Sequence, residues 1–511
     1  MHRRTRTTMG IALATARVAA GAGVAGADPG PVGLLGEAGL AGLDALNEHG
    51  EATGSTDLSE LEGLSDATAL EGLLPGLGAG DTGSAEVYSF SDGFDRDSTL
   101  GWSGTGSLEL GAADEFYRTP AEIPEDPGAV LRTQAAPMAW SLPGADGAPY
   151  PGDATRVMYA SRDAHDRPIA VSGVLLTPSV EWRGEGERPL VVIAPGTQGQ
   201  GDSCAPSKSI SSLVTVTPPS GIALGYEAIP ADVWLAQGAT VMITDYEGLG
   251  TEGVHTYVNR DSQAHTVIDA ARAARGLPDS GVGDATPIGL YGYSQGGGAV
   301  AAAAEQLGSY GPDVADQVVG ALVGAPPADL AATLDEVDGS SLAGVIGYAL
   351  NAMRAVYPDE IEPVMDRHLN DRGRAMLDRV AEQCIGETVL QYGFARTEDF
   401  TVSGRSLAEV IAEEPVAREV MDRNRIGTVG PTVPIYLWGG THDDVVPHGQ
   451  VQQLAADWCA AGADVEFEPF VQPSVLRGAG VGHVLPMLGS QGQAVSWLGD
   501  RFAGAPTTGT C

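Results

Sequence analysis

Short apolar runs, most of them followed by a glycine-rich or polar turn, recur from residue 190 to the end of the chain. Runs of this length without alternation are typical of strands that are buried on both faces of a parallel sheet. They lie at residues 190–194, 240–246, 287–293, 318–324, 433–438 and 465–467. Helical patterns separate several of them, at residues 262–275 and 299–307 and near the C-terminus at 494–502. This order of strands and helices predicts an α/β fold with a mostly parallel central sheet.

Two segments depart from this order. Upstream, the apolar segments 156–161 and 169–176 flank a polar turn, which predicts an antiparallel hairpin. After residue 324 the pattern becomes helical for about a hundred residues, with an apolar helix at 342–353 and an amphipathic one at 361–380. We therefore expect a helical insertion, a cap or lid, at about residues 326–430.

The third apolar run ends in a serine enclosed by glycines, in the pattern Gly292-x-Ser294-x-Gly296. A strand that turns sharply into a helix at such a pattern exposes the serine hydroxyl above the sheet edge, a nucleophile elbow. Side chains at the two glycines would collide with neighbouring backbone in so tight a turn. The alanine-rich helix that follows directs the positive end of its dipole at the serine. Ser294 is thus the candidate nucleophile.

A serine hydroxyl needs a base, and the base needs an acid to fix its tautomer. In folds with this elbow the chain order is serine, then acid, then histidine. His483 follows the last predicted strand and is the candidate base; His442 and His448 are the alternatives, and they are too close to the candidate acid along the chain. Asp443, which follows the strand at 433–438, is the candidate acid, with Asp444 and Glu468 as alternatives.

The loop after the strand at 190–194 has the sequence Pro-Gly-Thr-Gln-Gly. In folds of this kind that loop donates one backbone N–H to the oxyanion, and the residue after the nucleophile donates the second. Thr197 and Gln198 are the candidates for the first donor, and Gln295 is the candidate for the second. An ordinary loop without this role is the alternative.

The composition is strongly acidic, with 67 Asp and Glu against 28 Lys and Arg and a net charge of −39. Such a chain repels phosphate backbones, so nucleic acid is not expected as a partner. Residues 28–113 are rich in Gly, Ala, Leu, Ser, Asp and Glu, which predicts an acidic, low-complexity and poorly ordered extension. The folded domain is predicted to occupy residues 114–511.

Basic residues at positions 2–6, an apolar stretch at 9–16 and Ala25-Gly26-Ala27 resemble a secretory signal peptide that ends at residue 27. No uncharged apolar run reaches 18 residues, so we expect no membrane span in the mature chain. The predicted location is extracellular, either secreted or associated with the cell wall.

Four cysteines agree with export, because an even number is readily paired in an oxidising compartment. Three connectivities are possible, and the simplest joins Cys204 to Cys384 and Cys459 to Cys511. No Cys-x-x-Cys or His-x-x-x-His spacing is present, so we expect no metal site, and the predicted chemistry needs no cofactor.

Residues 114–503 resemble the secretory lipase family, typified by the yeast A-type lipase and its actinobacterial relatives. The resemblance is carried by Phe116-Tyr117, Ala194-Pro195-Gly196-Thr197, Cys204-Ala205-Pro206-Ser207, Asp245-Tyr246-Glu247-Gly248-Leu249-Gly250, Gly292-Tyr293-Ser294-Gln295-Gly296-Gly297 and Gly324-Ala325-Pro326-Pro327-Ala328-Asp329-Leu330. It implies an α/β-hydrolase fold with a helical cap, the triad Ser294, Asp443 and His483, and two disulfides paired as above.

The expected activity is hydrolysis of acylglycerols or other carboxylic esters through an acyl-enzyme, with transient contact to a lipid surface. The apolar helix at 342–353 would then line an acyl-chain pocket or face lipid, or else it is a core helix. A serine peptidase or an acyltransferase on the same fold is one rival, since the fold does not set the acyl acceptor. A non-catalytic, surface-associated protein is the other.

Overall fold

The computed structural model describes residues 115–136, 152–210, 214–217, 221–278 and 280–511. The expected signal peptide (1–27) and acidic extension (28–113) lie outside these residues.

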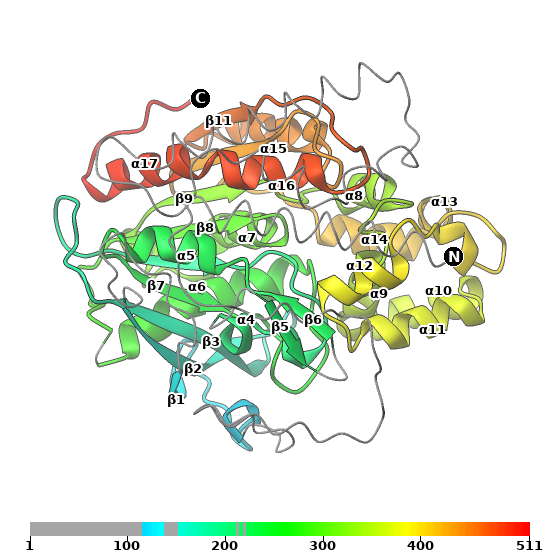
Figure 1. The fold of residues 1–511 in the computed structure, drawn as a ribbon, viewed down its shortest axis with the longest axis horizontal. Coiled ribbons are helices and arrows are strands. Elements are labelled where there is room, and N and C mark those ends of the chain that lie inside the picture. Colours follow the sequence, from blue (N-terminus) through cyan, green and yellow to red (C-terminus); the bar gives the residue numbers. More distant parts are fainter. Residues whose placement is uncertain (1–114, 137–151, 211–213, 218–220, 279) are drawn as a thin grey trace, which may run out of the picture. The chain divides into compact units, whose positions relative to one another are not determined.

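The described residues form a central sheet of nine strands (Figure 1). In spatial order these are β1 (Val130–Ala136), β2 (Gly152–Arg162), β3 (Pro168–Pro178), β7 (Thr240–Thr244), β4 (Leu190–Ala194), β8 (Ile288–Tyr293), β9 (Val318–Gly324), β10 (Ile435–Gly440) and β11 (Val465–Phe470). In this spatial order, each strand from β7 to β11 pairs in parallel with the next. The pairs β1–β2, β2–β3 and β3–β7 are antiparallel. The mostly parallel sheet predicted from the apolar runs is confirmed.

Helices cover the sheet. They are α5 (Ala228–Leu235), α6 (Arg260–Gly276), α7 (Gln295–Tyr310), α15 (His448–Ala460), α16 (Val481–Gly489) and α17 (Gln491–Phe502). The chain crosses from β4 to β7 through α5 in one direction and from β7 to β8 through α6 in the other. Because such crossovers are right-handed, α5 and α6 lie on opposite faces of the sheet. The reversal also makes β4 and β8 neighbours, so the loops after these two strands meet at one edge.

Several elements were not predicted, among them three strands and the helices α5, α15 and α16. The edge strand β1 carries polar, partly exposed residues and lacks the apolar run by which the buried strands were found. A short antiparallel hairpin, β5 (Val214–Thr217) and β6 (Gly221–Leu224), follows the short helix α4 (Pro206–Ser209).

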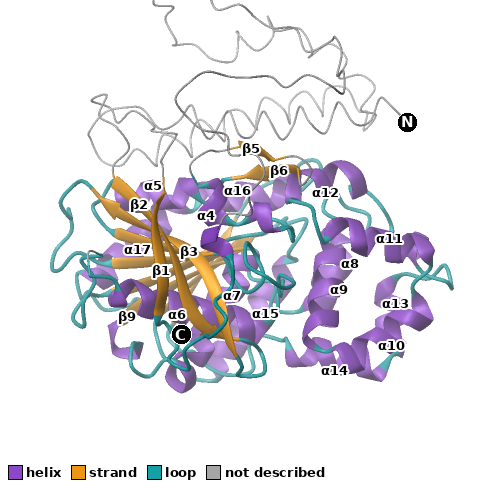
Figure 2. Ribbon diagram, turned by 90° about the horizontal axis from the view of Figure 1, so that it is seen from below, coloured by secondary structure: helices purple, strands orange, loops and turns teal. Residues whose placement is uncertain are grey.

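The segment between β9 and β10 is helical, as expected for a cap, and Figure 2 shows its helices gathered beside the sheet. They are α8 (Leu330–Val337), α9 (Val345–Val356), α10 (Pro358–His368), α11 (Asp371–Val380), α12 (Ile385–Tyr392), α13 (Leu407–Glu413) and α14 (Pro415–Arg423). The single amphipathic helix predicted at 361–380 is wrong. It is broken at Leu369, which is extended, and at Asn370, whose side chain accepts the Gly373 N–H and so begins α11.

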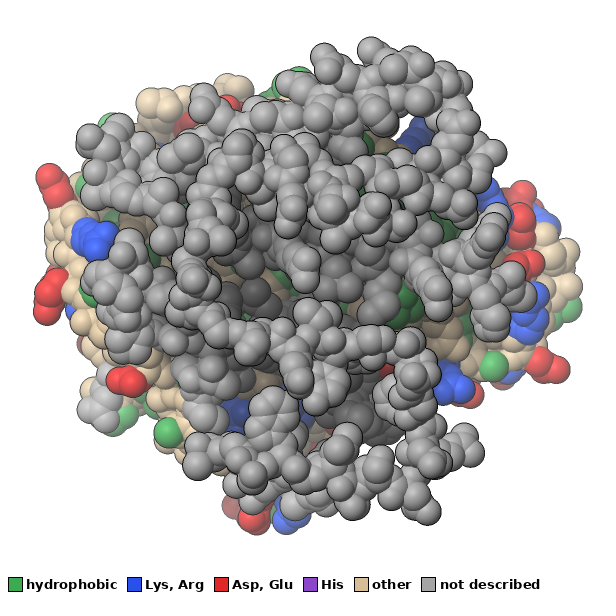
Figure 3. Space-filling model, viewed as in Figure 1, with side chains coloured by type: hydrophobic (Ala, Val, Ile, Leu, Met, Phe, Trp, Pro, Cys, Tyr) green, Lys and Arg blue, Asp and Glu red, His purple; other side chains and the backbone are tan. Residues whose placement is uncertain are grey.

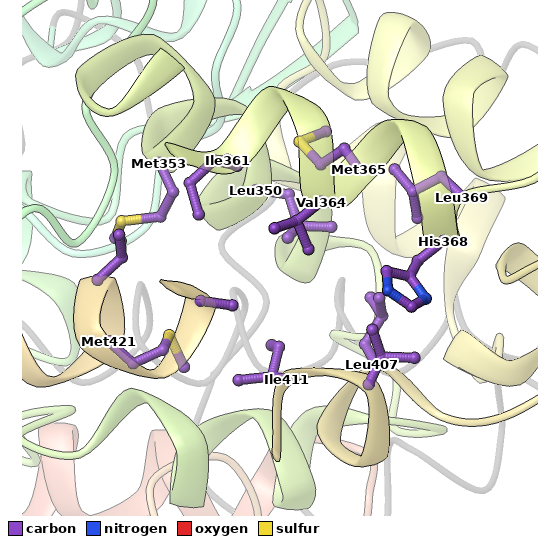
Figure 4. Close-up of a pocket in the computed structure, with 13 residues that line it drawn as sticks. Leu350, Met353, Ile361, Val364, Met365, His368, Leu369, Leu407, Ile411 and Met421 are labelled. Carbon is purple, nitrogen blue, oxygen red and sulfur yellow. The ribbon is translucent and has the colours of Figure 1, made fainter. Parts of the chain in front are cut away.

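The apolar helix α9 contributes to the interior of the cap. A cavity of about 50 Å³ lies between α9, α10, α13 and α14, and Figure 4 shows Leu350, Met353 and Val364 among the side chains around it. All but one of its lining residues are apolar; the exception is His368, whose Nε2 lies 2.7 Å from Glu414 Oε1. The apolar cavity beside α9 is compatible with both interpretations of this helix, an acyl-chain pocket and a core helix.

The outer surface of the cap carries both signs of charge. Arg405 pairs with Glu413 at 2.7 Å, and Arg423 lies 3.3 Å from Glu360. Figure 3 shows acidic and basic side chains beside each other on the visible part of the cap at the right. These exposed pairs contribute little stability individually.

Both disulfides pair as the simplest connectivity predicted. Cys459 at the end of α15 is joined to Cys511, and Cys204 is joined to Cys384, the residue before α12. Around the Cys204–Cys384 bridge, the Gln200 N–H donates to Gln383 O at 2.9 Å and the Ile385 N–H donates to Gln198 O at 2.8 Å. This disulfide thus fastens the cap to the segment that follows β4.

We expect the two disulfides to differ in their effect on activity. Replacing either pair by serine removes about 3–5 kcal/mol of stability, because both close long loops. Only the Cys204→Ser, Cys384→Ser variant should also lower kcat, by about tenfold to a hundredfold, because it loosens the backbone next to Gln198. Thermal unfolding and ester hydrolysis well below the melting temperature test this. Equal losses of kcat in the two double variants would contradict it.

Candidate active site

Ser294 lies in a sharp turn between β8 and α7. Its backbone has φ 60° and ψ −123°, a conformation that is costly for a residue with a side chain. The turn is closed by two glycines: a Cβ at Gly292 would lie 2.0 Å from Gly296 O, and a Cβ at Gly296 would lie 2.0 Å from Ala194 O. The collisions expected from the sequence are therefore present, and they involve the end of β4. Ser294 itself is partly exposed.

Asp443 and His483 form a buried hydrogen-bonded pair. Both Asp443 carboxylate oxygens lie close to His483 Nδ1, at 2.8 and 3.0 Å. Asp443 follows β10 and also accepts the N–H groups of Val445 and Val446 through Oδ1, at 3.0 and 2.9 Å. These amides fix the carboxylate, and the carboxylate in turn orients the imidazole.

The same imidazole lies against the turn that carries Ser294. The Tyr293 hydroxyl donates to His483 O at 2.7 Å, and the two rings are 5.1 Å apart between centroids. His483 Nε2 is buried without a hydrogen-bond partner among the described residues, and within them the Ser294 hydroxyl forms no hydrogen bond either. Such bonds often tighten only when substrate binds.

The glycine-rich surroundings of His483 in the sequence indicate a loop, but the structure places the residue in a helix. It belongs to the first turn of α16, which Gly480 begins with a left-handed backbone conformation. Asp444 fixes that turn: Oδ1 accepts the His483 N–H at 3.1 Å and Oδ2 accepts the Gly480 N–H at 2.9 Å. Asp444 therefore supports α16.

The alternative residues make other contacts. His442 Nδ1 lies 2.7 Å from Gln472 O, and the His448 ring stacks on Phe467. Glu468 accepts hydrogen bonds from the Tyr436 hydroxyl at 3.3 Å and from Gln493 at 3.1 Å. None of the three forms a hydrogen bond with the side chain of Ser294 or His483 in the described residues.

The loop after β4 lies against the same turn, because an added Cβ at Gly196 would come within 3.2 Å of Tyr293 O. Within the described residues the backbone N–H groups of Thr197 and Gln198 donate no hydrogen bond. Gln295 opens α7, so its N–H belongs to the first turn, where helical amides lack partners. These are the three amides expected to bind an oxyanion.

Sequence reasoning missed the side chains that hold this loop. The Tyr246 hydroxyl donates to Pro195 O and the Tyr226 hydroxyl donates to Thr197 O, both at 2.8 Å. The Gly196 N–H donates to Glu227 at 2.6 Å. Tyr257 bonds the Thr197 hydroxyl at 2.8 Å. Tyr246 was visible only as part of a family motif, and Tyr226 and Glu227 carried no signal at all.

A second set of polar contacts holds Gln295. Its side-chain amide lies 3.0 Å from His255 Nε2, and His255 Nδ1 lies 3.1 Å from Glu247 O. Burial lowers the pKa of His255 to about 4, so the ring is neutral and donates from Nδ1 to Glu247 while Nε2 accepts from Gln295. The nucleophile turn is thereby fixed from its helical side.

Two other kinds of feature are absent from the described residues. These residues contain no helix that is both long and apolar enough to cross a membrane. Nor do they contain a group of three or more His, Cys, Asp or Glu side chains arranged to hold a metal ion.

Comparison with known proteins identifies the family of the chain. The model of the secretory lipase family matches residues 215–510. The chain belongs to this family. The resemblance inferred from the sequence motifs is thereby confirmed.

Among relatives in the secretory lipase family, a protein of Mycobacterium tuberculosis named a probable inactive lipase is 29% identical over 400 residues, covering 78% of this chain and 84% of that protein. A secreted triacylglycerol lipase of Malassezia restricta is 27% identical, covering 77% and 80% of the two chains. Lipase 6 of Candida albicans is 26% identical over 79% of this chain and 84% of its own.

Solved structures show the same fold. Candida antarctica lipase A in its closed state matches with a TM-score of 0.62 at 20% identity, covering 77% of this chain and 87% of that one. The rice cell wall degrading esterase of Xanthomonas oryzae matches with a TM-score of 0.61 at 21% identity, covering 74% and 99%. The chain therefore has the α/β-hydrolase fold.

Proposed function

We propose that this protein is a secreted serine hydrolase that cleaves carboxylic esters, acylglycerols included, through an acyl-enzyme. The observation that carries the proposal is the buried Asp443–His483 pair, packed against the residue that precedes the strained Ser294. Membership of the secretory lipase family supports both an ester or lipid substrate and an extracellular location. Association with the cell wall stays a prediction.

In the proposed reaction, His483 Nε2 accepts the Ser294 proton while Ser294 Oγ bonds to the ester carbonyl carbon. The carbonyl oxygen becomes an oxyanion, which accepts hydrogen bonds from Gln295 N–H and from Thr197 or Gln198 N–H. The tetrahedral intermediate collapses, and the alcohol leaves with the proton from His483. Water then attacks the acyl-enzyme with His483 as base, which releases the acid and restores Ser294.

Asp443 has a defined role in these steps. Its carboxylate accepts the Nδ1–H of His483, which leaves Nε2 as the unprotonated, accepting nitrogen. It also stabilises the imidazolium that forms when the serine proton arrives. The unpartnered, buried Nε2 of His483 supports this role.

The test uses the full-length, disulfide-intact protein with p-nitrophenyl butyrate and a fluorophosphonate probe. We expect hydrolysis, and labelling confined to the peptide that contains Ser294, because only an activated serine reacts with such a probe. A folded protein that neither hydrolyses the ester nor reacts with the probe would refute the proposal. That result would favour a non-catalytic protein, and the Mycobacterium relative named as inactive makes the experiment informative.

The acyl acceptor and the chain length require separate substrates. Tributyrin, a matched peptide amide and an added alcohol acceptor distinguish a lipase from a peptidase and from an acyltransferase, which would use the same three residues. A series of esters from acetate to oleate then measures the preferred acyl length.

A further inference from the structure

Glu227 is a buried carboxyl that the proposed mechanism does not use. It immediately precedes α5, and its side chain accepts none of the N–H groups of the first helical turn. Its Oε1 instead accepts the N–H of Gly196 at 2.6 Å, in the loop that follows β4. Glu227 is 5% exposed, and within the described residues its carboxyl forms no other hydrogen bond and has no cationic partner.

The bond from Gly196 completes the fixation of the loop. The peptide between Pro195 and Gly196 is held at both ends, by the Tyr246 hydroxyl on its carbonyl and by Glu227 on its N–H. The Tyr226 hydroxyl holds the Thr197 carbonyl, and in a trans peptide this directs the Gln198 N–H the opposite way. Glu227 and Tyr226, adjacent in sequence, thus fix the two peptide planes that flank the Thr197 N–H, and the second of these planes carries the Gln198 N–H.

We propose that Glu227 is a positioning residue of the reaction: its carboxyl holds the Gly196 peptide, and it assists oxyanion formation only while it is uncharged. The inference rests on the proposed function. A neutral carboxyl still offers its carbonyl oxygen to the Gly196 N–H. An anion at the same place would oppose the negative charge that develops on the ester oxygen nearby, in surroundings that screen it poorly.

The charge state of Glu227 changes within the working range of a hydrolase. Burial without a cation raises the pKa of Glu227 to about 7, and the bond from Gly196 offsets only part of this shift. The carboxyl is therefore mostly neutral at pH 6 and mostly ionised at pH 8. Under this proposal kcat falls as the pH rises through 7.

Other titratable groups near Glu227 do not change charge in this interval. Burial raises the pKa of each of the surrounding phenols above the ordinary value, to about 12 for Tyr257, so they stay neutral. These phenols belong to Tyr226, Tyr246, Tyr257 and Tyr291. His255, which stacks on Tyr246, has a pKa of about 4 and is already neutral.

The experiment compares the pH dependence of kcat and KM for p-nitrophenyl butyrate, from pH 5.5 to 9, in the wild type and three variants. In the wild type we expect kcat to fall about tenfold between pH 6 and pH 9, the size of a modest charge effect. Glu227→Gln keeps an oxygen acceptor and carries no charge. It should lower kcat about twofold to threefold at pH 6 and lack the alkaline fall, with little change in KM.

The other variants separate position from charge. Tyr226→Phe removes the neighbouring hydrogen bond but leaves Glu227, so it should lower kcat by a similar factor at every pH and keep the alkaline fall. Glu227→Ala removes the acceptor and should lower kcat about tenfold to a hundredfold at all pH values.

Two results would overturn the inference while leaving the proposed function intact. These are an alkaline fall in Glu227→Gln as large as in the wild type, and a wild type whose kcat does not fall. A wild type that neither hydrolyses the ester nor reacts with the fluorophosphonate at any pH would refute the proposed function itself, and the role of Glu227 with it.

Discussion

Ser294→Ala is expected to lower kcat for p-nitrophenyl butyrate by about 10⁴- to 10⁶-fold, because the acyl-enzyme route has no nucleophile without the hydroxyl. The fold should survive. Within the described residues the Ser294 hydroxyl forms no hydrogen bond, so its removal leaves no partner unsatisfied. Alanine meets the same backbone strain at φ 60° that serine already bears.

The measurement needs purified protein that is matched in circular dichroism and melting temperature, with residual activity corrected for spontaneous hydrolysis. Ser309→Ala is a suitable control, because Ser309 is an exposed serine of the same helix whose hydroxyl donates only to Gln306 O. It should keep the wild-type rate and the wild-type fluorophosphonate labelling. A Ser294→Ala protein that turns over at more than about one hundredth of the wild-type rate would rule out the assigned nucleophile.

The buried strands of the sheet could be predicted from the sequence, because a strand that is buried on both faces consists of a continuous run of apolar residues. The five residues of β4 are all buried, and so are the six of β8, which is why continuous apolar runs located them. β1 pairs with a neighbour on one side only and shows the pattern of an exposed edge, so neither periodicity nor apolar content marked it. The break between α10 and α11 at Asn370 was not predicted either. The amphipathic pattern continues through this position, although the side chain of Asn370 caps a new helix there.

The nucleophile turn could be predicted because its geometry depends on local sterics. The glycines at 292 and 296 are required by backbone atoms only a few residues away or on the adjoining strand. The environment of the expected oxyanion amides depends on Tyr226, Glu227, Tyr246 and Tyr257, which are 29 to 60 residues distant from the loop that they hold. Such contacts arise only from the tertiary fold, since no spacing in the chain encodes them.

The choice between two adjacent aspartates also needed the fold. Chain order alone allows either Asp443 or Asp444, and both are buried. In the structure Asp443 accepts a hydrogen bond from the imidazole of His483, whereas Asp444 accepts one from the backbone N–H of His483 in α16. One aspartate is thus placed to act on the charge and tautomer of His483, and the other on its position.

This difference predicts opposite outcomes for two isosteric substitutions. In Asp443→Asn the amide oxygen can still accept the N–H groups of Val445 and Val446, and the NH₂ group then faces His483 Nδ1. Nδ1 must then become the acceptor, which places the ring proton on Nε2. A protonated Nε2 cannot receive the proton of Ser294. We expect kcat to fall about 10⁴-fold with little change in melting temperature.

In Asp444→Asn the two oxygens that accept the Gly480 and His483 N–H groups become one oxygen and one NH₂. One buried N–H then loses its acceptor, which should cost about 1–3 kcal/mol of stability and lower the melting temperature. The tautomer of His483 is unaffected, so kcat measured well below that temperature should fall less than about tenfold. Paired measurements of kcat and thermal unfolding on the two variants decide the matter. The contrary result is a folded Asp444→Asn protein that loses activity as completely as Asp443→Asn. Both carboxylates would then have to control the charge and tautomer of His483, and the assignment of a purely positional role to Asp444 would be wrong.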